Sequence, residues 1–267
     1  MSELLASVGD GLVIAKRNLI KVRRVPETLV FVLISPIMFV LLFAYVFGSA
    51  IDIPGSSYRE FLIGGIFAQT IVFGATFTGA GLAEDMQKGI INRFRSLPMS
   101  RVAVIAGRTA SDVVYNAISL TIMSITGLLV GWRINNGVPR ALAAFALLLL
   151  FAYAFSWVMA LVGLLVPSVE VVNNASFIVI FPLTFIANTF VPSDGLPTPL
   201  RVFAEWNPVS AVTQATRELF GNIPPGTPEP DAWPLQHPIL YTLVWVVLII
   251  AVFAPLSVRR YRRATLR

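Results

Sequence analysis

The stretch Ala141–Val166, ALAAFALLLLFAYAFSWVMALVGLLV, decides the fold. It runs for 26 residues without a charged side chain. A helix of about 20 mostly apolar residues is long enough to cross the hydrocarbon core of a bilayer. The stretch is too long for a strand and too uniformly apolar for a helix with one face in water. It therefore predicts a transmembrane helix.

The rest of the chain extends this prediction to a polytopic α-helical membrane protein. Hydrophobic residues make up 56% of the sequence and charged residues only 13%, whereas a soluble domain carries about 25% charged residues. One core cannot hide this much apolar side chain, so lipid must solvate part of it. Six transmembrane helices are expected, at Thr28–Ala50, Phe61–Ala83, Val102–Gly131, Ala141–Val166, Val171–Val191 and Ile239–Val258.

The lysine and arginine residues between these spans set the expected orientation. Fifteen lie in the N-terminal segment, in the segment between spans two and three, or in the tail, and these three segments share one side. The opposite side holds five. Both termini are therefore expected in the cytoplasm. The predicted organisation is one transmembrane domain: residues 1–27 form a cytoplasmic interfacial helix, 28–191 spans one to five, 192–238 an extracellular re-entrant or loop segment, 239–258 span six and 259–267 a basic cytoplasmic tail.

The N-terminal segment is predicted to be an amphipathic helix at the membrane surface, since apolar residues alternate there with basic and small ones. A disordered basic tail is the alternative. Near the opposite surface, Trp132, Trp206 and Trp233 are predicted to be interfacial anchors.

No catalytic, cofactor-binding or metal-binding signature is present. None of the three lysines follows a glycine, so a P-loop for ATP is excluded. The chain has no cysteine and a single histidine, His237, which argues against thiolate or histidine-rich metal sites. No catalytic residue, cofactor or metal ligand is predicted, and we expect the chain not to be an enzyme.

The segment between spans two and three is the most informative. Met86, Ile90, Phe94 and Leu97 recur at helical spacing and give one apolar face. Acidic residues stand at its start and basic residues near its end, as the helix dipole favours, and Pro98 stops it. Such a short amphipathic helix needs a surface to be stable. It either lies flat on the membrane or inserts into a groove on a soluble partner.

Here the sequence resembles a known family. The residues Glu84, Gly89, Arg93, Leu97, Pro98 and Arg101 look like the coupling-helix pattern of ABC-2 type transporter permeases. After span five, the run Glu205–Ser210, with Ala215, Arg217 and Glu218, resembles the motif of that family's helices that dip into the outer leaflet. The basic N-terminal segment resembles its membrane-surface helix. The daunorubicin-resistance branch of the family is the most similar.

The resemblance implies a permease that works with a separate P-loop ATPase, which binds ATP and Mg²⁺, and with a second permease copy or a sister permease. It implies export of a drug, antibiotic or lipid across a bacterial plasma membrane; nucleic acid is not an expected partner. It also implies an extracellular re-entrant motif at Asn207, Pro208, Arg217 and Glu218. The implied contact with the ATPase comprises Glu84, Asp85, Met86, Lys88, Gly89, Ile90, Arg93, Phe94, Leu97 and Pro98.

Inside the membrane, span three carries a candidate polar pair. Arg108 precedes Asp112 by four residues, so both lie on one helix face. The pair either lines a polar pathway or satisfies itself within the helix packing. An ion-coupled secondary transporter, a polysaccharide-type exporter permease and a membrane scaffold that docks a partner remain alternative functions. The chain shows no internal repeat of the kind common in secondary transporters.

Overall fold

The computed structural model describes residues 13–17, 20, 34, 36–47, 57–90, 101–166, 168–223, 226–227 and 229–264. Within these ranges the chain is helical and contains no β-strand. The helices are the π-helical turn η1 (Phe43–Phe47), α3 (Tyr58–Gly74), α4 (Thr76–Gln87), α6 (Arg101–Val130), α7 (Gly137–Leu165), α8 (Val169–Phe185), the 3-10 turn η2 (Ser193–Gly195), α9 (Thr198–Trp206), α10 (Pro208–Phe220), α11 (Trp233–Gln236) and α12 (Pro238–Ala264).

Four helical segments of the described chain are long and apolar enough to cross a membrane. They are Tyr58–Gln87, which joins α3 and α4, Ala103–Val130, Gly137–Leu165 and Pro238–Arg263. They correspond to predicted spans two, three, four and six, and the protein is a multi-pass membrane protein. Of predicted span one, Thr28–Ala50, the structure describes residues 34 and 36–47, and a shorter apolar helix covers Pro36–Val46.

Predicted span five, Val171–Val191, is shorter than expected. The observed helix α8 ends at Phe185 and has 17 residues, about 25 Å at 1.5 Å per residue. Pro182 lies inside this helix, and the backbone from residue 186 to residue 192 is irregular. The prediction failed at this end because apolar composition continues to Val191 although the helix does not.

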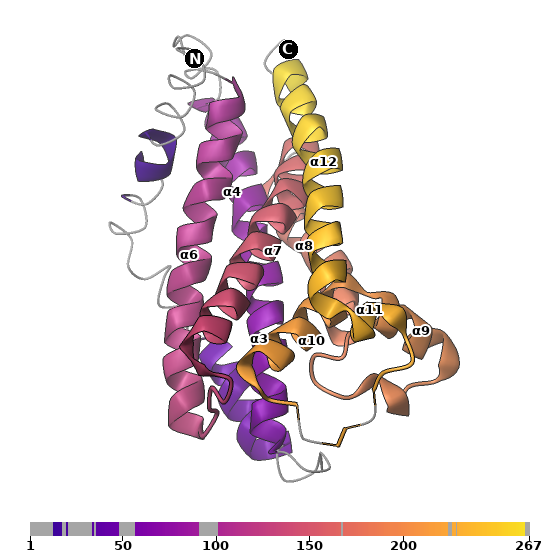
Figure 1. Ribbon diagram of the computed structural model, residues 1–267. Helices are drawn as coiled ribbons and strands as arrows, with labels where there is room; N and C mark the ends of the chain where they lie inside the picture. The colour runs from indigo at the N-terminus through magenta and orange to yellow at the C-terminus, as the bar shows by residue number, and fades with distance from the viewer. Residues whose placement is uncertain are drawn as a thin grey trace.

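The helices form one bundle with α7 near its centre, packed against α12, α4, α10 and α6 (Figure 1). The end of α4, the start of α6 and the end of α12 lie together at one end of the bundle, here called the basic end. The start of α3 and the short helices α9, α10 and α11 lie at the opposite end, here called the far end. The short helices α9, α10 and α11 thus lie at the end of the bundle opposite the arginine-rich tail.

Two sequence expectations need correction in this frame. Glu84 to Gln87 form the last turn of α4 and continue the spanning helix, so a separate coupling helix does not begin at Glu84. The helix stops at Lys88, and Gly89 follows with a positive φ of 64°, which glycine adopts without steric cost. Trp132 is fully buried and donates from Nε1 to Asn222 Oδ1 at 2.7 Å, so it is a core residue and not an interfacial anchor.

Candidate functional site

A row of small and polar residues joins the helix pair α3–α4 to α6. This row, here called the ladder, consists of Gly74, Thr78, Gly81, Arg108, Asp112 and Asn116. Asp112 of α6 is 2% exposed, and its carboxylate accepts a hydrogen bond from the hydroxyl of Thr78. One turn later, Asn116 donates from Nδ2 to the backbone oxygen of Asp112 at 2.9 Å. Gly74 faces Asn116 and Gly81 faces Arg108, and a Cβ at either glycine would collide with the side chain opposite. The two glycines therefore leave room for these side chains in the positions that they occupy.

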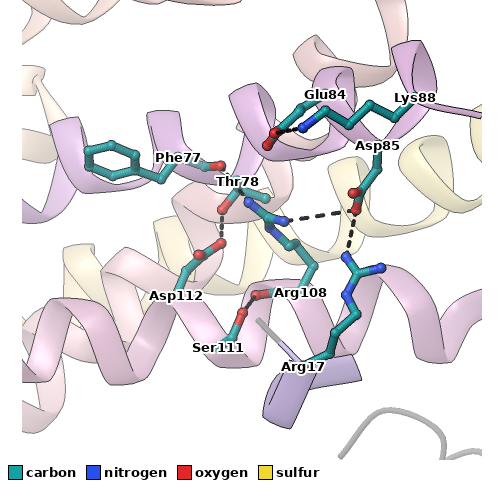
Figure 2. A network of polar contacts seen from close by, with 9 residues as sticks. All are labelled: Arg17, Phe77, Thr78, Glu84, Asp85, Lys88, Arg108, Ser111 and Asp112. Carbon is teal, nitrogen blue, oxygen red and sulfur yellow. Dashed lines mark hydrogen bonds and ion pairs between the residues drawn. The ribbon is translucent and has the colours of Figure 1, made fainter. Parts of the chain in front are cut away.

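Asp85 closes the ladder at the basic end. It is 7% exposed, and its Oδ2 lies 2.9 Å from Nη2 of Arg17 and 4.0 Å from Nη1 of Arg108 (Figure 2). Arg17 belongs to the short helix at residues 13–17, and Arg108 to α6. One buried carboxylate thus ties the N-terminal helix and α6 to the end of α4. The contact with Arg17 is a charge-assisted hydrogen bond, which is stronger than a neutral one, whereas the contact with Arg108 is an ion pair without a hydrogen bond.

The predicted pair of Arg108 with Asp112 is not formed. Arg108 directs Nη2 to the backbone oxygen of Phe77 at 3.1 Å and Nη1 toward Asp85, while Asp112 bonds to Thr78 (Figure 2). The two side chains do lie on one face of α6, as their spacing predicted. A partner on the neighbouring helix is closer to each of them than they are to each other.

The predicted ATPase contact begins beside this network. Lys88 Nζ lies 2.6 Å from Glu84 Oε1, and this hydrogen bond and charge raise the pKa of Lys88 above its ordinary value. Met86 packs against a small core cluster around Leu82, and a Cβ at Gly89 would meet nothing within 4 Å. Ile90 is half-buried. The rest of the predicted contact, Arg93, Phe94, Leu97 and Pro98, lies outside the described residues.

At the far end, the predicted re-entrant motif organises the N-terminus of α10. Asn207 caps the helix, accepting at Oδ1 from Val209 N at 2.9 Å, and Pro208 occupies the first helical position. The Nδ2 of Asn207 donates to the backbone oxygen of Leu183 at 2.7 Å. Leu183 lies in the last turn of α8, where carbonyl groups lack helical partners. Asn207 therefore satisfies a free group on each of two helices.

The other two residues of the motif lie in the last turn of α10. Arg217 is 2% exposed and donates to three backbone oxygens, on Phe61, Asn188 and Thr189. Burial raises the pKa of Glu218, whose backbone oxygen accepts from Asn136 Nδ2 at 2.7 Å. The sequence motif thus marks residues that hold α10 to the starts of α3 and α7 and to the end of α8.

Replacing Asn207 with alanine should destabilise the protein by about 2 kcal/mol. The loss of an N-cap accounts for about 1 kcal/mol and the loss of the donor to Leu183 for about another 1 kcal/mol. Asn207→Ser is the matched control, since serine keeps the cap but cannot reach as a donor to α8, and about half the loss is expected. Thermal unfolding of the purified variants measures both. Equal melting temperatures for wild type and Asn207→Ala would contradict the double role.

Three parts of these sites had no signal in the sequence. Arg17 was one of five basic residues near the N-terminus, and nothing singled it out as the partner of Asp85. Thr78 is an unremarkable threonine in an apolar span. The role of Asn222 as acceptor for Trp132 depends on a contact between residues 90 positions apart. Among the described residues, no group of three or more histidine, aspartate or glutamate side chains could hold a metal ion.

Comparison with known proteins gives a further, independent line of evidence on the family of this chain. The family model of the ABC-2 type transporters matches residues 11–220. The chain is 32% identical over 246 residues to the daunorubicin resistance ABC transporter permease protein DrrB1 of Streptomyces coeruleorubidus, covering 92% of this chain and 83% of that protein. It is 24% identical over 240 residues to the probable doxorubicin resistance ABC transporter permease protein DrrC of Mycobacterium tuberculosis, covering 89% and 83%. It is also 24% identical over 214 residues to the putative transport permease ycf38 of Cyanophora paradoxa, covering 79% and 73%.

Proposed function

Since the chain belongs to the ABC-2 type transporter family, we propose that it moves a hydrophobic or amphipathic substrate out of the cell, driven by a separate ATPase subunit. The chain is an ABC exporter permease subunit, as its drug-resistance relatives are. The substrate class is the proposal: a drug, an antibiotic or a lipid. The similarity to the daunorubicin resistance permease over 92% of the chain is the observation that carries it.

The ATPase is proposed to dock at the basic end. The chain itself has no P-loop, so ATP and Mg²⁺ would be bound by the partner. The last turn of α4 and the residues that follow, including Gly89, present a charged pair and an open backbone at this end. A movement imposed on this turn would reach α6 and the helix at 13–17 through the two arginines on Asp85.

The orientation and assembly follow from the same proposal. The basic end faces the cytoplasm, in keeping with the excess of lysine and arginine there, and the far end faces outward. A second permease copy, or a sister permease, completes the transporter within the lipid bilayer. The apolar side chains exposed along α8 and α12, such as Phe177, Ile178 and Val247, are available for lipid and for this second copy.

Co-purification tests the proposal most directly. The chain would be expressed with the P-loop ATPase encoded beside it, solubilised in mild detergent, and assayed for ATP hydrolysis with and without the permease. A stable complex with altered hydrolysis supports the exporter function. A well-folded permease that neither binds the ATPase nor changes its rate would refute it and favour an ion-coupled transporter or a scaffold.

Gly89→Arg and Glu84→Lys are expected to lower ATP-driven transport by about tenfold, a change within the usual range of coupling between distant sites. Arginine at residue 89 places a bulky side chain where the backbone has a positive φ, and lysine at residue 84 replaces the ion pair with Lys88 by a repulsion. Both changes lie in or just after the last, charged turn of the spanning helix, so insertion into the membrane should be unchanged. Transport at the wild-type rate in both variants, at equal expression, would refute the contact at this turn.

A further inference from the structure

Arg217 carries a positive charge inside the far end of the bundle without a carboxylate to balance it. Its Nε lies 2.8 Å from the backbone oxygen of Phe61, and its Nη2 lies 2.9 Å and 3.1 Å from those of Asn188 and Thr189. The guanidinium also stacks on the Phe61 ring, 3.5 Å from its centroid. In the part of the chain that the structure describes, no ion pair to Arg217 is formed. Among the described residues, three backbone carbonyls and the Phe61 ring hold this charge, and all of them lie outside α10.

The same place gathers unpaired polar atoms. Buried side-chain atoms without a hydrogen-bond partner include Arg217 Nη1, Asn188 Oδ1, Thr189 Oγ1 and Thr213 Oγ1. These four are half of all such atoms among the described residues, so they mark one locus. A buried polar group without a partner is costly, and hydration removes the cost. The closed arrangement around Arg217 is therefore only partly satisfied and would gain hydrogen bonds if water entered.

At this contact α3 presents two adjacent glycines to α10 and to residue 189. A Cβ at Gly64 of α3 would lie 3.0 Å from Arg217 Cγ, and a Cβ at Gly65 would lie 2.9 Å from Thr189 Cα. At these two glycines the contact is therefore made by backbone atoms and by the Arg217 stem. Residues 186–192 are irregular, so no helical hydrogen-bond ladder must break for them to shift. Arg217 is the residue that joins all three, since its hydrogen bonds run from α10 both to α3 and to this segment. Two further hydrogen bonds each join one pair: Asn188 N donates to Ser210 Oγ of α10, and the Tyr58 hydroxyl of α3 donates to the backbone oxygen of Phe190.

We propose that Arg217 is the latch of an exit gate at the far end of the permease. In the closed state its guanidinium binds α10 to the start of α3 and to residues 188–189. In the open state these bonds are exchanged for bonds to water, and α10 separates from Gly64 and Gly65. This separation exposes the hydroxyls of Thr189 and Thr213, which are buried in the closed state, and cargo leaves past them. The gate's role in export rests on the proposed function; the latch itself is a property of this chain alone.

Thiol accessibility tests the latch without transport. The chain contains no cysteine, so a Thr189→Cys substitution introduces the only thiol that the reagent can label. Thr189 is fully buried, and cysteine is close to it in size. The full-length variant would be placed in lipid nanodiscs, which expose both membrane faces, and treated with a charged thiol reagent. With Arg217 present, the thiol at position 189 should react slowly.

Combining Thr189→Cys with Arg217→Gln should speed labelling by about tenfold or more, since charge-assisted hydrogen bonds made only in the closed state are lost. Arg140→Gln is the matched control, because Arg140 is an exposed arginine of α7, and labelling should stay slow. Gly195→Cys is the exposed reference and should react fast in every background. An unchanged rate at position 189 after Arg217→Gln would overturn the latch.

A second reporter separates opening of the gate from loss of the fold. Ser156→Cys lies fully buried in α7 and should remain protected when Arg217 is glutamine. If both positions reacted, the same two labelling rates would be measured in a Gly64→Ala background, which keeps Arg217 but crowds its Cγ. Faster labelling at position 189 alone would then support the latch, and protection at both positions would overturn it.

The outcome is independent of the exporter assay. A latch that responds to Arg217→Gln in a chain that binds no ATPase would leave the gate standing and remove the proposed function. An ATPase complex that transports cargo normally in the Arg217→Gln variant, with position 189 still protected, would remove the gate and leave the proposed function standing.

Discussion

Replacement of Gly163 by valine should prevent α4 and α7 from packing and destabilise the protein by more than about 3 kcal/mol. A Cβ at Gly163 would overlap the backbone oxygen of Gly79 and lie 2.7 Å from its Cα. A Cβ at Gly79 would in turn lie 2.7 Å from the backbone oxygen of Met159. The two helices therefore cross backbone to backbone, and neither can move aside as a flexible side chain could. Small residues are what permit such crossings in membranes.

Thermal unfolding of the detergent-purified protein, followed by size-exclusion chromatography, measures this loss. Ala146→Val is the matched control, because Ala146 is exposed on the same helix and gains the same kind of side chain. Its melting temperature should stay close to that of the wild type. A Gly163→Val variant as stable as Ala146→Val would mean that α4 and α7 do not cross in contact at this point.

Apolar length predicted the helices well where it was the only constraint. Spans three, four and six of the prediction match α6, α7 and α12 within a few residues at most ends, because runs of apolar residues have few other structures in lipid. The match failed where side chains compete for the backbone. The helix α8 ends six residues before the apolar run does, and Asn207 and Arg217, far along the chain, take up the carbonyl groups that this early end leaves free.

The sites were predicted as segments and motifs, but their partners were not. The Asn207–Pro208 motif was singled out from the sequence, and in the structure Asn207 caps α10, while its re-entrant position stays a prediction. The spacing of Arg108 and Asp112 predicted one helix face, yet it could not reveal that Thr78 and Asp85 lie opposite. Trp132 was placed at a surface because tryptophan favours interfaces, whereas an acceptor from Asn222 allowed it to be buried. Contacts between distant residues decide these cases, and periodicity carries no information about them.

The helix Tyr58–Gln87 connects the two polar sites of the molecule. Near its start, Phe61 and Gly64 contact Arg217 at the far end. At its last turn, Asp85 binds Arg17 and Arg108 at the basic end. The pair α3–α4, with the single turn residue Ala75 between the two helices, spans 30 residues, about 45 Å at 1.5 Å per residue, and can pass a displacement of one end to the other. A push on the last turn of α4 could therefore reach the Arg217 contact without any other moving part.

Asp85→Asn should abolish most transport and destabilise the protein by about 3 kcal/mol, the usual result of removing one partner from a buried ion pair. The Arg108 side chain is only 14% exposed, so its charge would be left nearly buried with no ion pair within 4.0 Å, and only the Asp112 carboxylate on the same helix face would remain near it. Arg17→Gln should cost less than about 1 kcal/mol, because the Arg17 side chain is 36% exposed and water can replace the pair. Thermal unfolding of the single variants, with ATP-driven transport measured on the same preparations, tests both values.

The double variant Arg108→Gln with Asp85→Asn then distinguishes a charge interaction from simple loss of packing. Removing both charges leaves no unpaired buried ion, so the double variant should be more stable than Asp85→Asn alone. Its transport should nevertheless stay low, since the tie between the end of α4 and α6 is gone in both variants. Recovery of stability together with transport would mean that Asp85 serves only to neutralise Arg108. Stability losses that simply add would mean that Asp85 and Arg108 do not interact, and the basic-end network would lose its central bond.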